Sequence, residues 1–216
     1  MHFVVTAGPT IEPLDQVRRL TNFSTGRLGS ELAFYLAQRG HRTTLLLSEQ
    51  AVHRGPLRGV DVTTFTTTAS LRDALLEASK VRVDGVFHAA AVCDFRFGEV
   101  WHPGEEGEPT PVQGGKISTR AGKLLAELVP TPKLIAELRE LFPDSWLVGW
   151  KYEVDGDRGS VVAAAARQIE NYKTSGCIAN GPAYGEGFGL VFNGDQHTHV
   201  ENAQALFDEL LRMISS

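Results

Sequence analysis

Residues 6–29 read T-A-G-P-T-I-E-P-L-D-Q-V-R-R-L-T-N-F-S-T-G-R-L-G, and this stretch decides the fold. It joins a short apolar run, residues 3–5, to residues 29–39, whose apolar side chains recur on one helical face. A strand followed by a helix opens a dinucleotide-binding domain, in which a tight G-x-G-x-x-G turn connects the two. Here the connection is roughly 18 residues long, where a few are usual. Connections of this length usually bind ligands or take part in catalysis, so the sequence predicts a functional loop.

The composition of this loop favours an anionic ligand. Small residues let backbone N–H groups approach an anion, and guanidinium and amide side chains add charge and hydrogen-bond donors. The small residues are Thr6, Gly8, Ser24, Thr25, Gly26 and Gly29, and the polar ones are Arg18, Arg19, Asn22 and Arg27. The alternative is a solvated loop that merely contains arginines.

The overall composition is that of an ordinary globular protein. The 216 residues suit a single domain, residues 1–216, with 42% hydrophobic and 22% charged residues. A net charge of −5 argues against non-specific nucleic-acid binding. No apolar run approaches the roughly 18 residues of a membrane span, and the chain begins without a signal peptide. Two separated cysteines, Cys93 and Cys177, are typical of reduced thiols, so we expect a cytoplasmic protein.

Strand and helix patterns alternate along the chain. This alternation predicts an α/β fold, a Rossmann-like doubly wound, mostly parallel sheet with helices on both faces. Further strands are predicted at 43–47, 85–91, 123–129, 146–150 and 177–179, a hairpin at 189–200 turning at Asn193-Gly194, and helices at 71–78 (capped by Ser70), 131–141, 160–172 and 202–214. Residues 98–115, rich in Gly, Pro and Glu, are predicted to be a mobile loop. In such sheets, ligands bind beyond the carboxyl ends of the strands, so the segments there should converge on one crevice.

The end of the predicted strand at 85–91 is the first candidate binding segment. Residues 88–95 read H-A-A-A-V-C-D-F, so small side chains are followed by a carboxylate. Small residues allow a ligand to approach backbone amides, and Asp94 could accept from hydroxyls or hold a metal. Packing against a helix explains the alanines equally well. We interpret His88 as a core histidine rather than a general base.

Two later segments could bind phosphate. Lys116 follows Gly114 and Gly115, and a lysine at the edge of a flexible loop can move onto phosphates as a point charge. Thr131-Pro132 opens a helix, whose first amides are unpaired and partly positive. A solvated lysine and an ordinary helix cap are the alternatives.

Together these segments resemble one family. The opening pattern T-A-G-P-T-x-E-P-x-D-x-V-R-x-x-T-N-x-S-T-G-x-x-G resembles that of phosphopantothenoylcysteine synthetases, which join 4′-phosphopantothenate to L-cysteine at the expense of a nucleoside triphosphate. Segments resembling later family motifs follow in the family's order, up to about Asn180. The patterns S-T-G-x-L-G, K-I-S, T-P-K and G-W-K look most like the monofunctional bacterial enzymes, which lack the fused decarboxylase domain.

The resemblance implies a role for each matching residue. Asn22 would bind the acyl-nucleotidylate intermediate, Lys116 would contact the triphosphate, and Arg18 and Ala90 would bind the pantothenate substrate. The nucleotide would contact Gly8, Ser24, Thr25, Gly26, His88, Ala89, Ala90, Asp94, Lys116, Thr131, Pro132, Lys133, Leu134, Trp150 and Lys173. The resemblance also implies Mg²⁺ with unassigned ligands, CTP in preference to ATP, and a homodimer whose subunits share each active site.

Some positions depart from the family pattern. Gly181 replaces an aspartate, Cys93 stands where alanine is common, and the family's lysines near residue 180 do not align, Lys173 being the nearest basic residue. A ligand-binding relative without catalytic activity is therefore one alternative. Another is a nicotinamide-dependent reductase, but the chain has no Y-x-x-x-K pair and its first loop lacks the G-x-G-x-x-G turn.

Overall fold

The computed structural model describes every residue except 104–108, 113, 119, 121, 193–196 and 216. An eight-stranded sheet forms its centre, in the strand order β13-β12-β11-β10-β6-β1-β4-β5. The strands from β11 to β5 are parallel, and β12 and β13 complete the other edge antiparallel. Their bounds are β1 His2–Ala7, β4 Arg42–Ser48, β5 Asp61–Phe65, β6 Gly85–His88, β10 Trp146–Tyr152, β11 Gly176–Asn180, β12 Phe188–Val191 and β13 His197–Val200.

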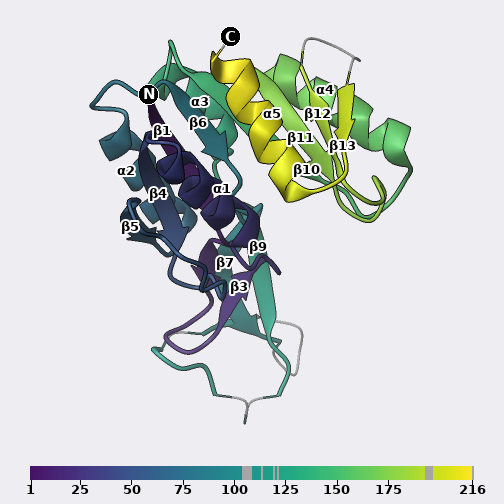
Figure 1. Cartoon of the computed structure of the whole chain (residues 1–216). Coiled ribbons are helices and arrows are strands. Elements are labelled where there is room, and N and C mark those ends of the chain that lie inside the picture. The colour runs from purple at the N-terminus through teal and green to yellow at the C-terminus, as the bar shows by residue number, and fades with distance from the viewer. Residues whose placement is uncertain (104–108, 113, 119, 121, 193–196, 216) are drawn as a thin grey trace.

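Helices cover both faces of this sheet (Figure 1). One apolar cluster packs α1 and α5 on one face, and two others pack α2, α3 and α4 on the opposite face. The helices are α1 Arg27–Gln38, α2 Thr68–Ala78, α3 Leu134–Leu141, α4 Arg158–Tyr172 and α5 Ala203–Ser215. The predicted Rossmann-like doubly wound fold is confirmed. The strand order reverses between β1 and β6, which is where such sheets bind ligands.

The apolar runs of the sequence form the central strands. All six residues of β1 and all four of β6 are buried, because helices cover both of their faces. Phe3 and Phe87 contact each other from these two strands, with ring centroids 5.7 Å apart. This part of the chain, the sheet with its five helices, is called the body below. No helix among the described residues is long and apolar enough to cross a membrane.

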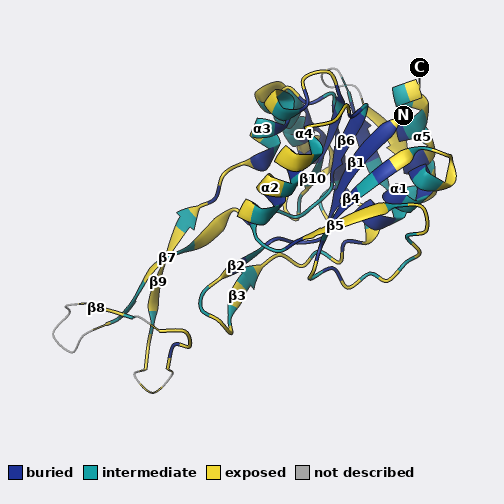
Figure 2. Cartoon of the chain, turned by 90° about the vertical axis from the view of Figure 1, so that its left-hand side faces the viewer, coloured by how far each residue is buried: buried dark blue, intermediate teal, exposed yellow. Residues whose placement is uncertain are grey.

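Two further groups of strands extend from one side of the body (Figure 2). The first group is the hairpin of β2 Ile11–Pro13 and β3 Arg19–Thr21, which comes between β1 and α1 in the sequence. The three-stranded sheet β8-β7-β9 lies between β6 and α3, with β7 Phe95–His102, β8 Thr110–Pro111 and β9 Leu125–Pro130. We call the hairpin together with residues 95–130 the arm; β2 contacts β7 within it.

The arm corrects two expectations. The opening connection contains a hairpin rather than only loop, and much of the region 98–115 belongs to β7 and β8; residues 104–108 and 113 lie outside the described part. Glycine, proline and acidic residues are poor strand formers on average, but cross-strand pairing with β9 decides the local structure here. The predicted strand at 123–129 is β9, two residues later at its start.

Two helix caps also differ from expectation. Thr67, not Ser70, is the N-cap of α2; Ser70 stands at the third helical position and completes a reciprocal capping box. Helix α3 begins at Leu134, after Lys133, because the hydroxyl of Thr131 donates to the carbonyl of Cys93 instead of capping the helix. The edge strand β5 was not predicted, and the expected turn at 193–194 lies outside the described residues.

Candidate functional site

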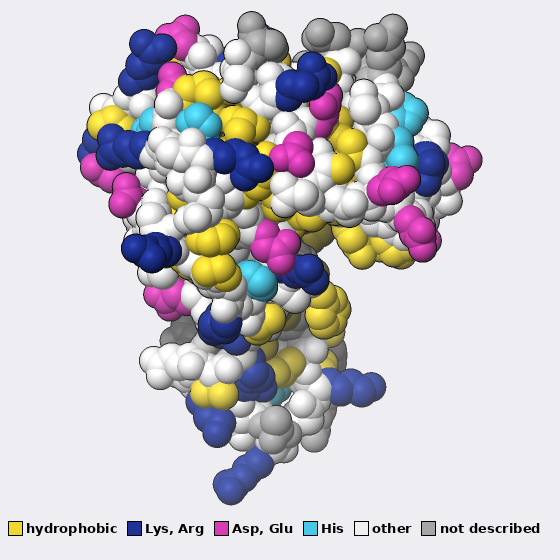
Figure 3. Space-filling model, in the orientation of Figure 1, with side chains coloured by type: hydrophobic (Ala, Val, Ile, Leu, Met, Phe, Trp, Pro, Cys, Tyr) yellow, Lys and Arg dark blue, Asp and Glu magenta, His cyan; other side chains and the backbone are white. Residues whose placement is uncertain are grey.

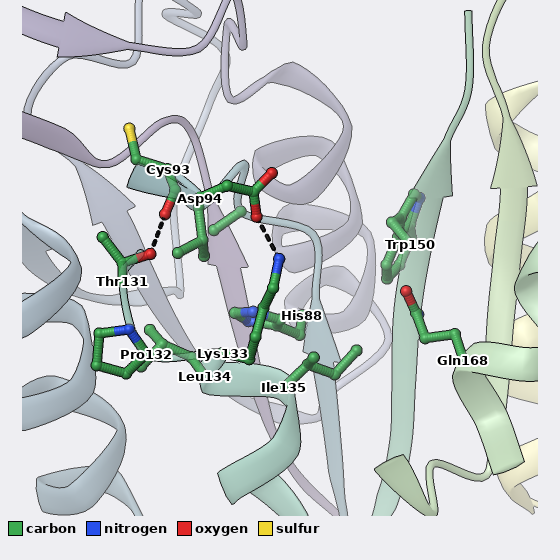
Figure 4. Close-up of a pocket in the computed structure, with 12 residues that line it drawn as sticks. His88, Cys93, Asp94, Thr131, Pro132, Lys133, Leu134, Ile135, Trp150 and Gln168 are labelled. Atoms are coloured by element: carbon green, nitrogen blue, oxygen red, sulfur yellow. Dashed lines mark hydrogen bonds and ion pairs between the residues drawn. The ribbon is translucent and has the colours of Figure 1, made fainter. Parts of the chain in front are cut away.

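A pocket opens at the carboxyl ends of β6 and β10 (Figure 4). Its volume is about 160 Å³, whereas sites for whole small-molecule ligands are usually about 300–1,000 Å³. The lining residues are His88, Ala90, Val92, Cys93, Asp94, Thr131, Pro132, Lys133, Leu134, Ile135, Trp150 and Gln168. Eight of the predicted site residues are therefore in one cavity: His88, Ala90, Asp94, Thr131, Pro132, Lys133, Leu134 and Trp150.

His88 is a neutral side chain at the floor of this pocket. It is buried, and burial lowers the pKa of its imidazole to about 4. The hydroxyl oxygen of Thr6, on the neighbouring strand β1, accepts from the backbone N–H of Ala90 at 3.0 Å and lies 3.0 Å from Nδ1 of His88. The donor of the bond between Thr6 and His88 depends on the tautomer of the ring, and the neutral imidazole is uncharged in either tautomer.

Asp94 and Lys133 form an ion pair across the pocket. Their side chains remain 64% and 58% exposed. An exposed pair of this kind contributes little to stability, about 0–1 kcal/mol, so an incoming ligand can separate the two charges at low cost. The carboxylate and the ammonium group would then be available to a cation and an anion.

The amino end of α3 supplies backbone donors to the same pocket. No side chain caps this helix at Lys133. The segment is held in place because the N–H of Thr131 donates to the carbonyl of Asp94 at 2.9 Å. Unpaired amides and the helix dipole together favour an anion at this position.

The far wall is formed by residues of β10 and α4. Gly149, paired with His88 in the sheet, leaves space that Gln168 fills: a Cβ at Gly149 would lie 2.5 Å from Nε2 of that glutamine. The indole N–H of Trp150 is buried and has no partner among the described residues, and the same holds for the side-chain oxygen of Asn180 on the adjacent strand. Such unpaired polar atoms are uncommon and often lie at functional sites.

The small residues of the predicted loop form a turn that lies beside this pocket without lining it. Gly8 and Gly26 both have positive φ, 88° and 76°, and a Cβ on Gly26 would lie 3.4 Å from the backbone of Gly8. Ser24 and Thr25 belong to the same turn, and the carbonyl of Thr25 accepts from Val52 and His53. Only glycine allows so close an approach of the two segments in that conformation.

Asn22 connects this turn to Ala91, which lies in the segment after β6, because the predicted strand at 85–91 ends at His88. Its Nδ2 donates to the carbonyl of Ala91 at 3.2 Å, and the side chain is otherwise exposed. The N–H of Ala91 donates to the carbonyl of Gly8 at 3.0 Å. Asn22 and Gly8 are therefore adjacent to the pocket segment, as the sequence predicted for a common crevice. Ala89 lies between two pocket residues but does not line the cavity.

Arg18 and Lys116 do not line the pocket; both lie in the arm. Arg18 is in the turn between β2 and β3, where its guanidinium binds the carboxylate of Asp15 and the carbonyl of Ile117. Lys116, next to Ile117, is exposed. Lys and Arg side chains protrude from the arm in the surface view (Figure 3).

The expected place of Lys173 in the site is corrected by the topology. Helix α4 runs from the carboxyl end of β10 to the amino end of β11, and Lys173 terminates it at the latter edge. Its carbonyl accepts from the Nε of Arg139 at 3.0 Å. Because the pocket is at the opposite edge, this lysine does not contribute to it.

No sequence signal identifies Gln168 as a lining residue, because it is in the middle of a helix. Thr6 is predicted as a small residue of the opening loop, but the structure places it in β1 with its hydroxyl 3.0 Å from His88, which lines the pocket. No group of three or more possible metal ligands occurs among the described residues, and Asp94 is the pocket's acidic side chain there. Cys93 is buried, as expected for a packing residue, with Sγ 3.3 Å from the carbonyl of Thr10, and burial raises the pKa of its thiol.

The fold is that of a Rossmann-like α/β protein, and the pocket lies at the carboxyl ends of β6, which borders the reversal of strand order, and β10. More particularly, residues 1–209 match the family model described as DNA/pantothenate metabolism flavoprotein C-terminal domain, and the chain belongs to that family. The resemblance inferred from the sequence is thereby confirmed at the level of the family.

Known relatives agree with this assignment. The coenzyme A biosynthesis bifunctional protein CoaBC of Thermococcus kodakarensis is 31% identical over 221 residues; the match covers 98% of this chain and 51% of that protein. The chain thus spans about half the length of this curated relative.

Solved structures share the fold over the whole chain. The DNA/pantothenate metabolism flavoprotein of Streptococcus pneumoniae superposes with a TM-score of 0.84 at 24% identity, covering 100% of this chain and 98% of that one. A Cab2 mutant in complex with phosphopantothenate-cysteine has a TM-score of 0.73 at 18% identity, covering 100% and 89%.

Proposed function

We propose that this chain is a phosphopantothenate–cysteine ligase that acts in coenzyme A biosynthesis. The observation that carries the proposal is the pocket itself. It collects Ala90, Asp94, residues 131–134 and Trp150, which belong to separate motifs resembling the synthetase family, at the edge where such a fold binds ligands. The names of CoaBC and of the Cab2 complex give independent support.

The reaction needs activation of a carboxylate. The carboxylate of 4′-phosphopantothenate attacks the α-phosphate of the triphosphate, forming an acyl nucleotidylate and releasing pyrophosphate. The amine of cysteine then attacks the acyl carbon, forming the amide and releasing the nucleoside monophosphate. The protein supplies position and charge neutralisation rather than a covalent partner. CTP is the donor we favour, with ATP as the alternative.

The pocket residues suit the nucleotide. The amides at the start of α3 and the ammonium group of Lys133 would bind phosphate oxygens. His88 would offer Nε2 for a hydrogen bond with the ligand, and the indole of Trp150 offers an aromatic surface. Mg²⁺ fits these residues, because in nucleotide sites it is held by one or two carboxylates together with phosphates and water, and Asp94 supplies a carboxylate. When bound, the ion would offset the charge of the triphosphate.

A second subunit would complete the site. The pocket is too small for a nucleotide and an acyl substrate together, while Arg18 and Lys116 lie outside it in the arm. The arm exposes apolar side chains that a partner would cover, among them Phe95 at 44%, Leu125 at 52% and Leu128 at 50%. We therefore propose a homodimer in which the arm forms the interface and brings Arg18 to the substrate phosphate and Lys116 to the triphosphate. The buried, unpaired cysteines suit the reducing cytoplasm, where we place the enzyme.

Pyrophosphate release tests the proposal directly. Purified protein, phosphopantothenate, cysteine and Mg²⁺ should release pyrophosphate with CTP and form phosphopantothenoylcysteine, detected by mass spectrometry. ATP should work less well. If neither triphosphate yields pyrophosphate with all substrates present, the chain is a ligand-binding relative without this activity.

Asn22 provides a test of the order of steps. Asn22→Asp is nearly isosteric, but it removes both side-chain donors and adds negative charge beside the phosphates. It should slow consumption of the intermediate by cysteine more than its formation, so the acyl nucleotidylate should accumulate in a quenched reaction that contains cysteine. Capture by cysteine at the wild-type rate, with no accumulation, would exclude this role.

A further inference from the structure

We propose that Asp15 is a positioning residue whose carboxylate links the segment that carries Lys116 to the turn that carries Arg18. The two phosphate-binding cations then move together. The inference rests on the proposed function for the roles of the two cations. The link between the two segments is itself a property of the unliganded chain.

The carboxylate of Asp15 is the centre of a dense group of hydrogen bonds. Its side chain is only 1% exposed. Oδ1 accepts from the backbone N–H of Val17 at 2.8 Å and of Arg18 at 2.7 Å, which shapes the turn locally. Oδ2 accepts from Nε and Nη2 of Arg18 at 3.0 and 2.5 Å, and from the backbone N–H of Ile117 at 3.1 Å. One carboxylate thus holds two segments that are 102 residues apart.

Two more bonds strengthen the connection. Nη2 of Arg18 also donates to the carbonyl of Ile117 at 2.6 Å, and the N–H of Gln16 donates to the carbonyl of Gly115 at 3.0 Å. Bonds therefore hold the residues on both sides of Lys116. The Lys116 side chain is left exposed, with no hydrogen-bond or ion-pair partner among the described residues.

The same geometry leaves part of Arg18 available. Its Nε and Nη2 are used within the chain, while Nη1 has no partner in the described structure. A guanidinium with one side fixed by a carboxylate loses less freedom on binding a phosphate with the other side. Asp15 therefore orients Arg18 as well as placing Lys116.

The charge of Asp15 is needed for this arrangement. The hydrogen bonds from the Arg18 side chain hold the pKa of the carboxyl well below its usual range, with contributions from the N–H groups of Ile117, Val17 and Arg18. A buried carboxylate is costly unless donors surround it. If Ile117 moved away, Asp15 would lose one hydrogen-bond donor and Arg18 would lose one acceptor at the same time. This double loss favours the state in which the two segments are linked.

Asp15→Asn tests the inference, because the amide keeps the size of the side chain but presents N–H groups to the donors of Arg18 and Ile117. Backbone hydrogen exchange in the unliganded protein should become at least 10-fold faster at Gln16 and Ile117, whose N–H groups bond between the two segments. In turnover, the KM values for phosphopantothenate and for the triphosphate should both rise about 10-fold or more. Asp61→Asn, which alters an exposed ion pair of the body, is the matched control and should change neither reading.

Each outcome decides the matter. Unchanged exchange at Gln16 and Ile117, or a rise in the KM for phosphopantothenate alone, overturns the proposal. If Asp15→Asn does not fold by circular dichroism, Arg18→Lys replaces it, since it removes the bond to the Ile117 carbonyl while the carboxylate stays; a raised KM for the triphosphate and faster exchange at Ile117 would support the inference. If the wild type shows no turnover, the proposed function fails, but hydrogen exchange still tests the link between the two segments.

Discussion

The body and the arm of this chain are stabilised in different ways. In the body, β1 and β6 are buried on both faces by helices, and Phe87 is fully buried. In the arm, β9 has five exposed residues out of six, and Leu128 is 50% exposed. The body has its own apolar core, whereas the arm is a thin set of strands joined mainly by hydrogen bonds.

This difference separates stability from function. Burial of apolar surface is the dominant favourable contribution to folding, so changes in the body should act on the free energy of unfolding. The arm carries Arg18 and Lys116 but little buried surface, so changes there should act on turnover and on association. The predictions below, ordered from the largest expected effect to the smallest, examine this division.

The largest effect is expected in the core of the body. Phe87→Ala should lower the free energy of unfolding by about 3–5 kcal/mol, because it leaves a cavity between β6 and α1. Denaturant titration measures the change. The proposed division requires that turnover per folded molecule stays near the wild-type value in conditions where the variant is folded; a large loss there would mean that the core also tunes the site.

Lys116→Ala should produce the converse result in the arm. Turnover should fall by roughly two to three orders of magnitude, the usual cost of removing a group that stabilises developing charge. Stability should change by less than about 0.5 kcal/mol, because the side chain is exposed.

Lys123→Ala is the matched control, since Lys123 is a second exposed lysine of the arm that the family pattern does not match. Initial rates and melting curves of both variants decide the assignment. Equal, small losses in the two would reduce Lys116 to an ordinary surface residue.

His88 predicts how stability depends on pH. Its folded pKa of about 4 lies below the unfolded value near 6.5, so the unfolded chain binds more protons between these values. The wild type should therefore lose stability as the pH falls through this window, by about 3 kcal/mol at pH 4 from this group alone. His88→Gln, which cannot titrate, should lose correspondingly less in urea titrations at a series of pH values. Parallel curves for the two proteins would contradict the assignment.

The smallest effect concerns association. Leu128→Ser should weaken the proposed dimer by about 1 kcal/mol, or about fivefold in dissociation constant, because half of the side chain would leave an apolar interface. Sedimentation equilibrium measures it. Leu76→Ser is a close control, as Leu76 is 49% exposed on helix α2 of the body. The arm is not the interface if both changes have the same effect or if the wild type is monomeric.

The sequence predicted the body better than the arm for a physical reason. Apolar runs report burial: residues 3–5 are buried, and so are residues 147–149 within the predicted strand at 146–150, so both patterns were clear. The edge strand β5 reads D-V-T-T-F, with four exposed residues, and gave no such pattern. The strands of the arm depend on pairing between distant segments, and in the region 98–115 this pairing outweighs the local abundance of glycine, proline and acidic residues.

The candidate site shows the same limit. Asp94 and Thr131 could be proposed because their motifs are local in sequence, and the pocket contains both. The contact between Asp15 and Ile117 joins residues far apart, and the dependence of His88 on Thr6 crosses two strands. Neither has a local pattern. Lys173 was assigned to the site because it is close in sequence to β11. It precedes the amino end of that strand, however, whereas the pocket lies at the carboxyl ends of the strands.

The isolated bridge between Pro9 and Ala91 has a consequence for how the chain assembles. The N–H of Thr10 donates to the carbonyl of Ala91, and the N–H of Ala91 donates to the carbonyl of Gly8. These bonds join the two segments at the point where each one leaves the central sheet and enters the arm. Lengthening either arm segment beyond this point costs only about 0.6 kcal/mol of loop-closure entropy for each doubling of its length. The register of the central strands therefore does not depend on the length of either arm segment. Insertions could change the arm in evolution without changing how the central sheet forms.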